Sequence, residues 1–176
     1  MKTLLYTFRV MYNNTLKVMY NNSRVSIVFL LSAAVALIFA YVLEYFFNML
    51  PCKLCIYERI IYYIVGLLAV VYMLENNKIL IYAMFCSYLM GVVISFYHMG
   101  LEFHLFYDLL GCTEQASGNA SVEELRDNLL NINYSPSCDR PRYILGISLA
   151  MWNLIYLIVA LFLSGKIYCE EEKRSK

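Results

Sequence analysis

The sequence predicts an all-α membrane protein, a bundle of four transmembrane helices with two cysteine-bearing loops on the extracytoplasmic side. Composition is the first reason: the 176 residues are 61% hydrophobic and 15% charged, whereas soluble domains are about 45–50% apolar and about 25% charged. The second reason is that four apolar runs are long enough to compete as spans of a lipid bilayer. The net charge is +1, and no basic block outside the tails indicates binding to nucleic acid.

Four apolar runs define a transmembrane domain over residues 25–165, between tails at 1–24 and 166–176. A helix needs about 20 apolar residues to cross a bilayer. The second run is short, so Ile56 and Tyr57 are candidates to extend it. The expected spans are about 26–47, 60–74, 79–101 and 143–163.

Charged residues lie close to the ends of the first two spans. Glu44 falls near the end of the first span, where we expect its carboxylate to reach toward headgroup water rather than to have a buried role. Glu58 and Arg59 precede the second span and are expected at the membrane interface.

The distribution of Lys and Arg predicts the orientation, because these residues are enriched in cytoplasmic loops and tails. With four spans, the two tails and the turn between spans two and three share one side. That side carries nine of the 14 basic residues. Both termini are therefore expected in the cytoplasm of a bacterium, with the protein in the inner membrane and its cysteine-bearing loops in the periplasm.

Four of the six cysteines fall in the two outer loops, where disulfides persist. Cys86 falls within the third span and is expected to be an inert core thiol, and Cys169 a reduced thiol of the C-terminal tail. The outer cysteines are Cys52, Cys55, Cys112 and Cys138.

Cys52 and Cys55 form a Cys-x-x-Cys pair, a spacing typical of reactive thiols. Lys53 and Arg59 are nearby cations that favour the thiolate, which is the species that attacks disulfides. A disulfide across two intervening residues adds little stability, since the gain grows with loop length. The pair therefore favours redox chemistry over bracing.

Two other interpretations of the outer cysteines remain open at this point. They could form two structural disulfides, with three connectivities allowed by four cysteines. They could also hold zinc, although Cys112 and Cys138 lie twenty-six residues apart, unlike the paired spacing of zinc sites.

One short amphipathic helix is expected in the long outer loop. Ser121-Val122-Glu123-Glu124 has the pattern of a capping box, and apolar residues follow at near-helical spacing as far as Ile132. This helix could pack on the loop itself or lie on the outer surface of the membrane, and we favour the membrane surface.

The run Pro51-Cys52-Lys53-Leu54-Cys55-Ile56-Tyr57-Glu58-Arg59 resembles the signature of the DsbB family of disulfide bond formation proteins. Two further stretches agree with the family: residues 96–102 at the end of the third span, and residues 137–139 with 145–153 leading into the fourth. The resemblance covers about residues 26–165.

The resemblance implies a four-helix membrane oxidoreductase that reoxidises a soluble, DsbA-like thiol oxidase of the thioredoxin fold and passes two electrons to a membrane quinone. By similarity, Cys112 forms the mixed disulfide with the partner. Cys138 then exchanges with Cys52, and Cys55 faces the quinone as a thiolate.

The resemblance also implies a quinone site, for ubiquinone or menaquinone, and no metal. Arg59 would hold the quinone ring and His98 would lie near it, although His98 could instead be a polar side chain satisfied at the interface. His104 matches no motif. Alternatives are a vitamin-K-epoxide-reductase-like enzyme, in which the Cys-x-x-Cys is expected late in the chain, and a disulfide-braced membrane scaffold or receptor.

Overall fold

The structure, a computed structural model, describes residues 24–113 and 136–175. The predicted N-terminal tail, apart from Arg24, and the amphipathic helix predicted from Ser121 to Ile132 lie outside the described residues.

Four long helices make up almost all of the described chain, and each is long and apolar enough to cross a membrane. They are α2 (Arg24–Phe47), α3 (Lys53–Glu75), α4 (Lys78–Glu102) and α6 (Leu149–Ser175). The only sheet among the described residues has two strands, β1 (Tyr143–Ile144) and β2 (Ile147–Ser148). The predicted class, an all-α protein with four helices able to span a membrane, is confirmed.

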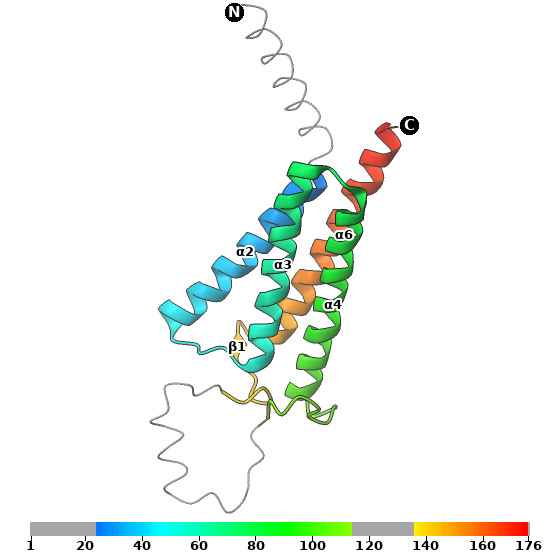
Figure 1. Ribbon diagram of the computed structural model, residues 1–176. Helices are drawn as coiled ribbons and strands as arrows, with labels where there is room; N and C mark the ends of the chain where they lie inside the picture. Colours follow the sequence, from blue (N-terminus) through cyan, green and yellow to red (C-terminus); the bar gives the residue numbers. More distant parts are fainter. Residues whose placement is uncertain (1–23, 114–135, 176) are drawn as a thin grey trace, which may run out of the picture.

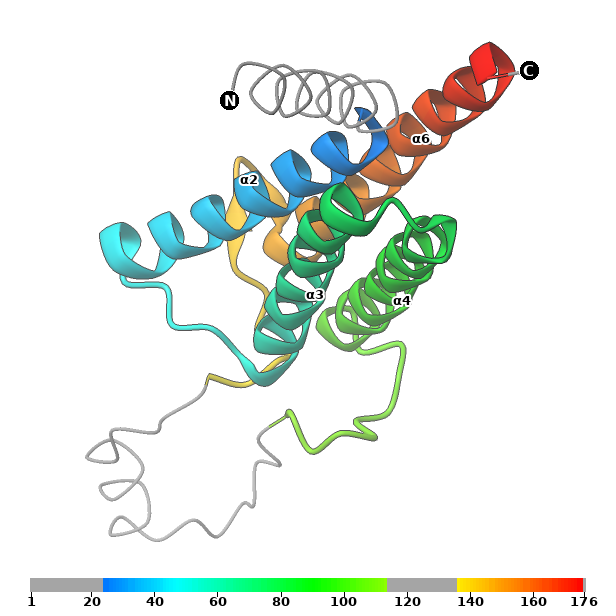
Figure 2. The same cartoon turned by 45° about the horizontal axis from the view of Figure 1, so that its top comes forward.

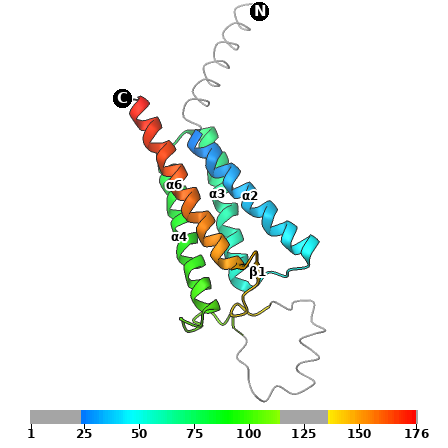
Figure 3. The same cartoon turned by 180° about the vertical axis from the view of Figure 1, so that it is seen from behind.

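The helices pack around a common core. α3 lies between α2 and α4, and α6 contacts α2 and α4 from behind (Figure 1; Figure 3). The start of α2, the turn between α3 and α4 and the end of α6 lie at one end of the bundle. The other end, which we call the thiol end, carries Cys52, Cys55, Cys112 and Cys138. α2 diverges from α3 toward the thiol end (Figure 2).

Two helix starts differ from the predicted spans. α3 begins at Lys53, seven residues before the predicted start, because Cys52 caps it: the Cys55 amide donates to Cys52 Sγ over 3.3 Å. α6 begins at Leu149, six residues after the predicted start, because β1 and β2 form an antiparallel hairpin in which Tyr143 pairs with Ser148.

Other local features explain where the helices turn and end. Asn76 ends α3 in a left-handed conformation with φ 51°, and the Asn77 side chain accepts the Ile79 amide at the start of α4. α6 continues to Ser175, so residues 166–175, predicted as a tail, extend the fourth helix. Cys169 lies exposed on this extension.

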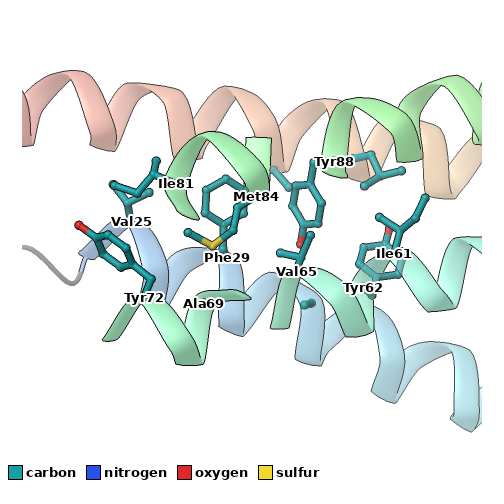
Figure 4. Close-up of a cluster of buried hydrophobic side chains, with 13 residues drawn as sticks. Val25, Phe29, Ile61, Tyr62, Val65, Ala69, Tyr72, Ile81, Met84 and Tyr88 are labelled. Carbon is teal, nitrogen blue, oxygen red and sulfur yellow. The ribbon is translucent and has the colours of Figure 1, made fainter. Parts of the chain in front are cut away.

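Apolar side chains fill the core between the helices. Phe29, Met84 and Tyr88 are fully buried and meet between α2 and α4 (Figure 4). Gly91 permits close packing of α4 and α6, because a Cβ there would lie 3.2 Å from Leu157 Cδ1.

The outward faces of the helices are also apolar, as expected of surfaces in contact with lipid. Ile38, Leu67 and Phe162 are each more than 60% exposed. Cys86 also lies exposed on α4, rather than in the core as the sequence suggested.

Candidate redox site

Cys52 and Cys55 lie together at the start of α3. Both are free thiols, and their Sγ atoms are 2.7 Å apart, so the pair can close to a disulfide with a small displacement. The positive end of the helix dipole favours a thiolate here. The hydrogen bond from the Cys55 thiol lowers the pKa of Cys52, although burial of Cys52 opposes this shift. The pair is therefore suited to thiol–disulfide exchange.

Cys112 and Cys138 are joined by a disulfide, with their Cα atoms 5.5 Å apart. The Cys138 amide also donates to the Cys112 carbonyl over 3.0 Å. This bond selects one of the three connectivities left open by the sequence. It also argues against a zinc site of four thiolates, since two of the four sulfurs are bonded to each other.

The two cysteine pairs are packed against each other. Cys52, Cys112 and Cys138 form one buried cluster with Leu54 and Leu101, and Cys55 packs on its edge. Thiol–disulfide exchange needs the attacking thiolate to reach a disulfide sulfur directly. The cluster therefore brings together the groups that such an exchange requires.

His98 connects the thiols to a buried carboxylate. Its Nε2 lies 3.6 Å from Cys52 Sγ, and its Nδ1 lies 3.3 Å from Glu58 Oε1. The imidazole is buried, and its role near a quinone stays a prediction. Glu58, expected at the interface, is buried as well, on the inner face of α3.

A chain of hydrogen bonds continues from Glu58 into the bundle. Ser95 Oγ donates to Glu58 Oε1 over 2.9 Å, and Asn153 Nδ2 donates to Ser95 Oγ over 2.7 Å. The Tyr62 hydroxyl donates to Asn153 Oδ1 over 2.6 Å. We call Glu58, Ser95, Asn153 and Tyr62 the polar chain; it joins α3, α4 and α6.

No member of the polar chain was predicted from the sequence to belong to the site. The usable signal was that Ser95 and Asn153 interrupt apolar helices, where a polar side chain usually has a partner or a function. Their partners lie on other helices, at distances in sequence that periodicity does not reveal.

Arg59 forms an ion pair with Glu44, across α3 and α2. The guanidinium also lies over the Tyr41 ring, 5.0 Å from its centre, and Nη2 donates to the Ala40 carbonyl over 3.4 Å. Glu44 is thus paired with Arg59, and its approach to headgroup water stays a prediction. Lys53 Nζ donates to the Gly111 carbonyl over 2.8 Å, so both cations expected to favour the thiolate have other partners.

A cavity of about 720 Å³ opens beside the thiols, between α2, α3, α6 and the hairpin. Most of its wall is apolar, and its polar lining residues include Cys52, Cys55, Arg59, His98 and Asn153. An apolar cavity of this volume with a few converging polar groups is typical of a small-molecule site. These residues fit a flat, lipid-soluble ring with oxygen atoms that need hydrogen-bond donors or a cation.

One group of side chains in the described residues has the arrangement of metal ligands. Sγ of Cys52, Sγ of Cys55 and a ring nitrogen of His98 lie within 4.8 Å of one another. A structural zinc site needs four protein ligands, one more than this group supplies. The absence of a metal remains a prediction.

His104, which matched no motif, lies exposed in the loop after α4 with φ 55° and takes no part in the site.

Four membrane-length helices that bring a free thiol pair against a disulfide define a membrane protein of thiol–disulfide chemistry. Residues 22–167 match the family described as Disulfide bond formation protein DsbB. The chain belongs to this family, and the resemblance based on residues 51–59 is confirmed. The protein is therefore a membrane protein of disulfide bond formation.

Among curated proteins, the chain is similar to Uncharacterized protein RP370 of Rickettsia prowazekii (strain Madrid E). The two are 26% identical over 147 residues, which cover 81% of this chain and 85% of that protein. No solved structure matches the chain.

Proposed function

We propose that the protein is a quinone-dependent thiol:disulfide oxidoreductase of the bacterial inner membrane. It reoxidises a periplasmic, DsbA-like thiol oxidase and delivers the electrons to ubiquinone or menaquinone. The observation that carries the proposal is the cavity: both thiols of the Cys-x-x-Cys pair line it, together with Arg59 and His98.

The exchange begins at the relay disulfide. A thiolate of the partner attacks Cys112 Sγ, and the bond to Cys138 breaks. The Cys138 thiolate then attacks Cys52 in the oxidised Cys52–Cys55 pair, which leaves Cys55 as a thiolate. The second thiolate of the partner attacks the mixed disulfide, so the partner leaves oxidised and Cys112 is freed.

The cycle closes when Cys112 attacks Cys138 in the Cys52–Cys138 bond. This step restores the relay disulfide and leaves Cys52 and Cys55 reduced, which is the arrangement of sulfurs that the structure has. A quinone held in the cavity would supply the oxidant: two electrons and two protons would leave the two thiols, which balances their conversion back to a disulfide.

Four side chains that line the cavity have roles in this proposal. Cys55 would face a quinone held there, and Arg59 would attract a quinone oxygen on which negative charge develops. His98 takes the proton from Cys52 through Nε2, while Glu58 stabilises the imidazolium through Nδ1. The coupling to a quinone is needed because oxidants of the DsbA kind have potentials of about −120 mV and cannot be reoxidised by ordinary thiol pools.

The orientation follows from the basic residues. Lys78, at the α3–α4 turn, and Lys166 and Lys173, toward the end of α6, fall at or toward the end of the bundle away from the thiols. That end is assigned to the cytoplasm, so both termini lie there and the thiol end faces the periplasm.

Quinone absorbance tests the proposal. Purified protein is mixed with a reduced DsbA-like partner and a soluble quinone, and wild type is compared with Cys55→Ser and Cys112→Ser. We expect wild type to reduce the quinone and these two variants to leave it oxidised. Cys86→Ser is the control, since this exposed thiol lies on α4 away from the cavity, and it should match wild type.

If wild type reduces neither ubiquinone nor menaquinone analogues with any of several thiol partners, the proposal of an enzyme is wrong. The buried disulfide would then be a brace, and the protein a membrane scaffold or receptor.

A further inference from the structure

We propose that Lys53 is a positioning residue that holds the relay disulfide, Cys112–Cys138, against Cys52. Lys53 lies between the two cysteines of the Cys-x-x-Cys pair, and its Nζ donates to the Gly111 carbonyl over 2.8 Å. Gly111 directly precedes Cys112, so this hydrogen bond ties one cysteine pair to the other. The consequence for turnover rests on the proposed function, but the positioning does not.

The segment that carries Cys112 is fixed to α4 by a different set of bonds. The Tyr97 hydroxyl donates to the Tyr107 carbonyl over 3.1 Å and accepts the Leu109 amide over 2.9 Å. Lys53 adds a tie to α3, which carries Cys52 and Cys55. Together the two attachments set where Cys112 lies relative to the thiol pair.

Local hydrogen bonds stiffen the segment that carries Cys112, so the bond from Lys53 to Gly111 also restrains Cys112. The Asp108 carboxylate accepts hydrogen bonds from the Thr113 amide and hydroxyl over 2.6 and 2.7 Å, and from the Leu110 amide over 3.0 Å. Burial raises the pKa of Asp108, but these hydrogen bonds outweigh it and lower the pKa. Gly111 has φ 59°, a conformation that glycine adopts without strain.

The tie has opposite effects on two reactions. Cys112 is 6% exposed and Cys138 1% exposed, in the same cluster as Cys52. Exchange between Cys138 and Cys52 therefore gains from the tie, because the sulfurs are held together. Attack by a thiol from solution is slowed, because the disulfide is accessible only when the segment moves away from α3.

The first test measures how well the sulfurs are held together. A variant that keeps only Cys52 and Cys112, with the other four cysteines replaced by serine, is equilibrated with glutathione redox buffers. The fraction of Cys52–Cys112 disulfide gives an effective concentration. Lys53→Met, which keeps the apolar stem, should lower it by about threefold to tenfold, the effect of one charge-assisted hydrogen bond.

Matched variants identify the cause. Lys53→Arg keeps a charged donor and should restore most of the effective concentration. Lys78→Met removes a lysine at the opposite end of the bundle and should leave it unchanged. Lys53→Gln, with a neutral donor, provides a second substitution if Lys53→Met does not fold.

The second test measures access from solution. With Cys52 and Cys55 replaced by serine, dithiothreitol reduces the Cys112–Cys138 disulfide, and Lys53→Met should speed this reduction several-fold. A merely structural defect would not lower the effective concentration and raise access together while the helical circular dichroism stays the same. An unchanged effective concentration in Lys53→Met overturns the proposal.

Neither test uses a quinone or a protein partner. If the quinone assay fails while both lysine effects are found, the proposed enzyme function is wrong and the positioning role stands. If the quinone assay succeeds and the lysine effects are absent, only the positioning role is wrong.

Discussion

The contacts that join the helices differ between the two ends of the bundle. Away from the thiols, Phe29, Met84 and Tyr88 fill the space between helices with aromatic and sulfur-containing side chains. Phe29 and Tyr88 meet edge to face, with ring centres 5.2 Å apart. Toward the thiol end, hydrogen bonds from Glu58 through Ser95 to Asn153 join the helices, beside the packed side chains of Leu54 and Leu101.

One end of the bundle contributes mainly to helix association, and the other end carries the reactive groups. Lipid tails are as apolar as the helices, so helices associate in a bilayer through close packing and polar contacts. Among the described residues, the apolar end supplies close packing together with neutral hydroxyl contacts, such as the one between Ser32 Oγ and the Tyr88 hydroxyl at 2.7 Å. The thiol end contains buried polar groups, and burying them is unfavourable unless they are hydrogen-bonded. Here the hydrogen bonds orient the His98 imidazole next to Cys52.

The largest expected effect comes from replacing a thiol at the thiol end. Cys55→Ser should reduce quinone turnover to background, because a serine hydroxyl cannot form the disulfide. Cys86→Ser makes the same chemical change on the exposed face of α4 and should leave turnover unchanged. Absorbance of the quinone checks both. Equal losses of quinone turnover in the two variants would show that the loss is not specific to the thiol end.

Glu58 should give the next largest effect. Glu58→Gln keeps the shape but removes the charge that stabilises the His98 imidazolium, so turnover should fall about a hundredfold, the usual scale for a proton-transfer group. Glu75→Gln, at the exposed end of the same helix, is the control. Turnover of Glu58→Gln within twofold of wild type would mean that the buried carboxylate only supports the fold.

The apolar end should respond in stability rather than in turnover. Phe29→Ala removes a fully buried ring, and a buried Phe→Ala change costs about 3–5 kcal/mol in water-soluble cores. We expect less here, since in a bilayer the packing is lost without transfer to water. Thermal unfolding in detergent measures the loss, while turnover per folded molecule should stay near wild type. A specific fall in that turnover would show that the two ends are coupled.

The smallest effect is expected from Glu44, which touches the site only through Arg59. Glu44→Gln should raise the KM for quinone about threefold to tenfold with little change in kcat, because the guanidinium loses a charged partner. Glu170→Gln, exposed on α6, is the control. A change in kcat alone would argue that Glu44 does not act by placing Arg59.

Much of this architecture could be predicted from the sequence. Apolar runs predicted four spans because a membrane requires about 20 apolar residues in each helix. The run from Pro51 to Arg59 indicated the family, which the match over residues 22–167 confirms. Periodicity did not distinguish the hairpin before Leu149 from a helix, since its residues are as apolar as a span.

The polar contacts could not be read from the sequence for a physical reason. Glu58 was expected at the interface because it directly precedes the second predicted span. Its burial depends on donors from Ser95 and His98, which come from another helix and are 37 and 40 residues away in the chain. The ion pair between Glu44 and Arg59 likewise joins two helices, and the sequence alone did not reveal it.

The divergence of α2 at the thiol end has a consequence for how the protein meets its electron acceptor. Val35 and Phe39 of α2 line the cavity, and each is about half exposed. Because α2 lies at the edge of the bundle, the proposed long-tailed quinone would enter sideways from the hydrocarbon phase, past α2, without crossing water. The relevant dose of acceptor is then its mole fraction in the bilayer. Diluting the vesicles with buffer should leave the rate unchanged, whereas diluting the quinone with added phospholipid should lower it.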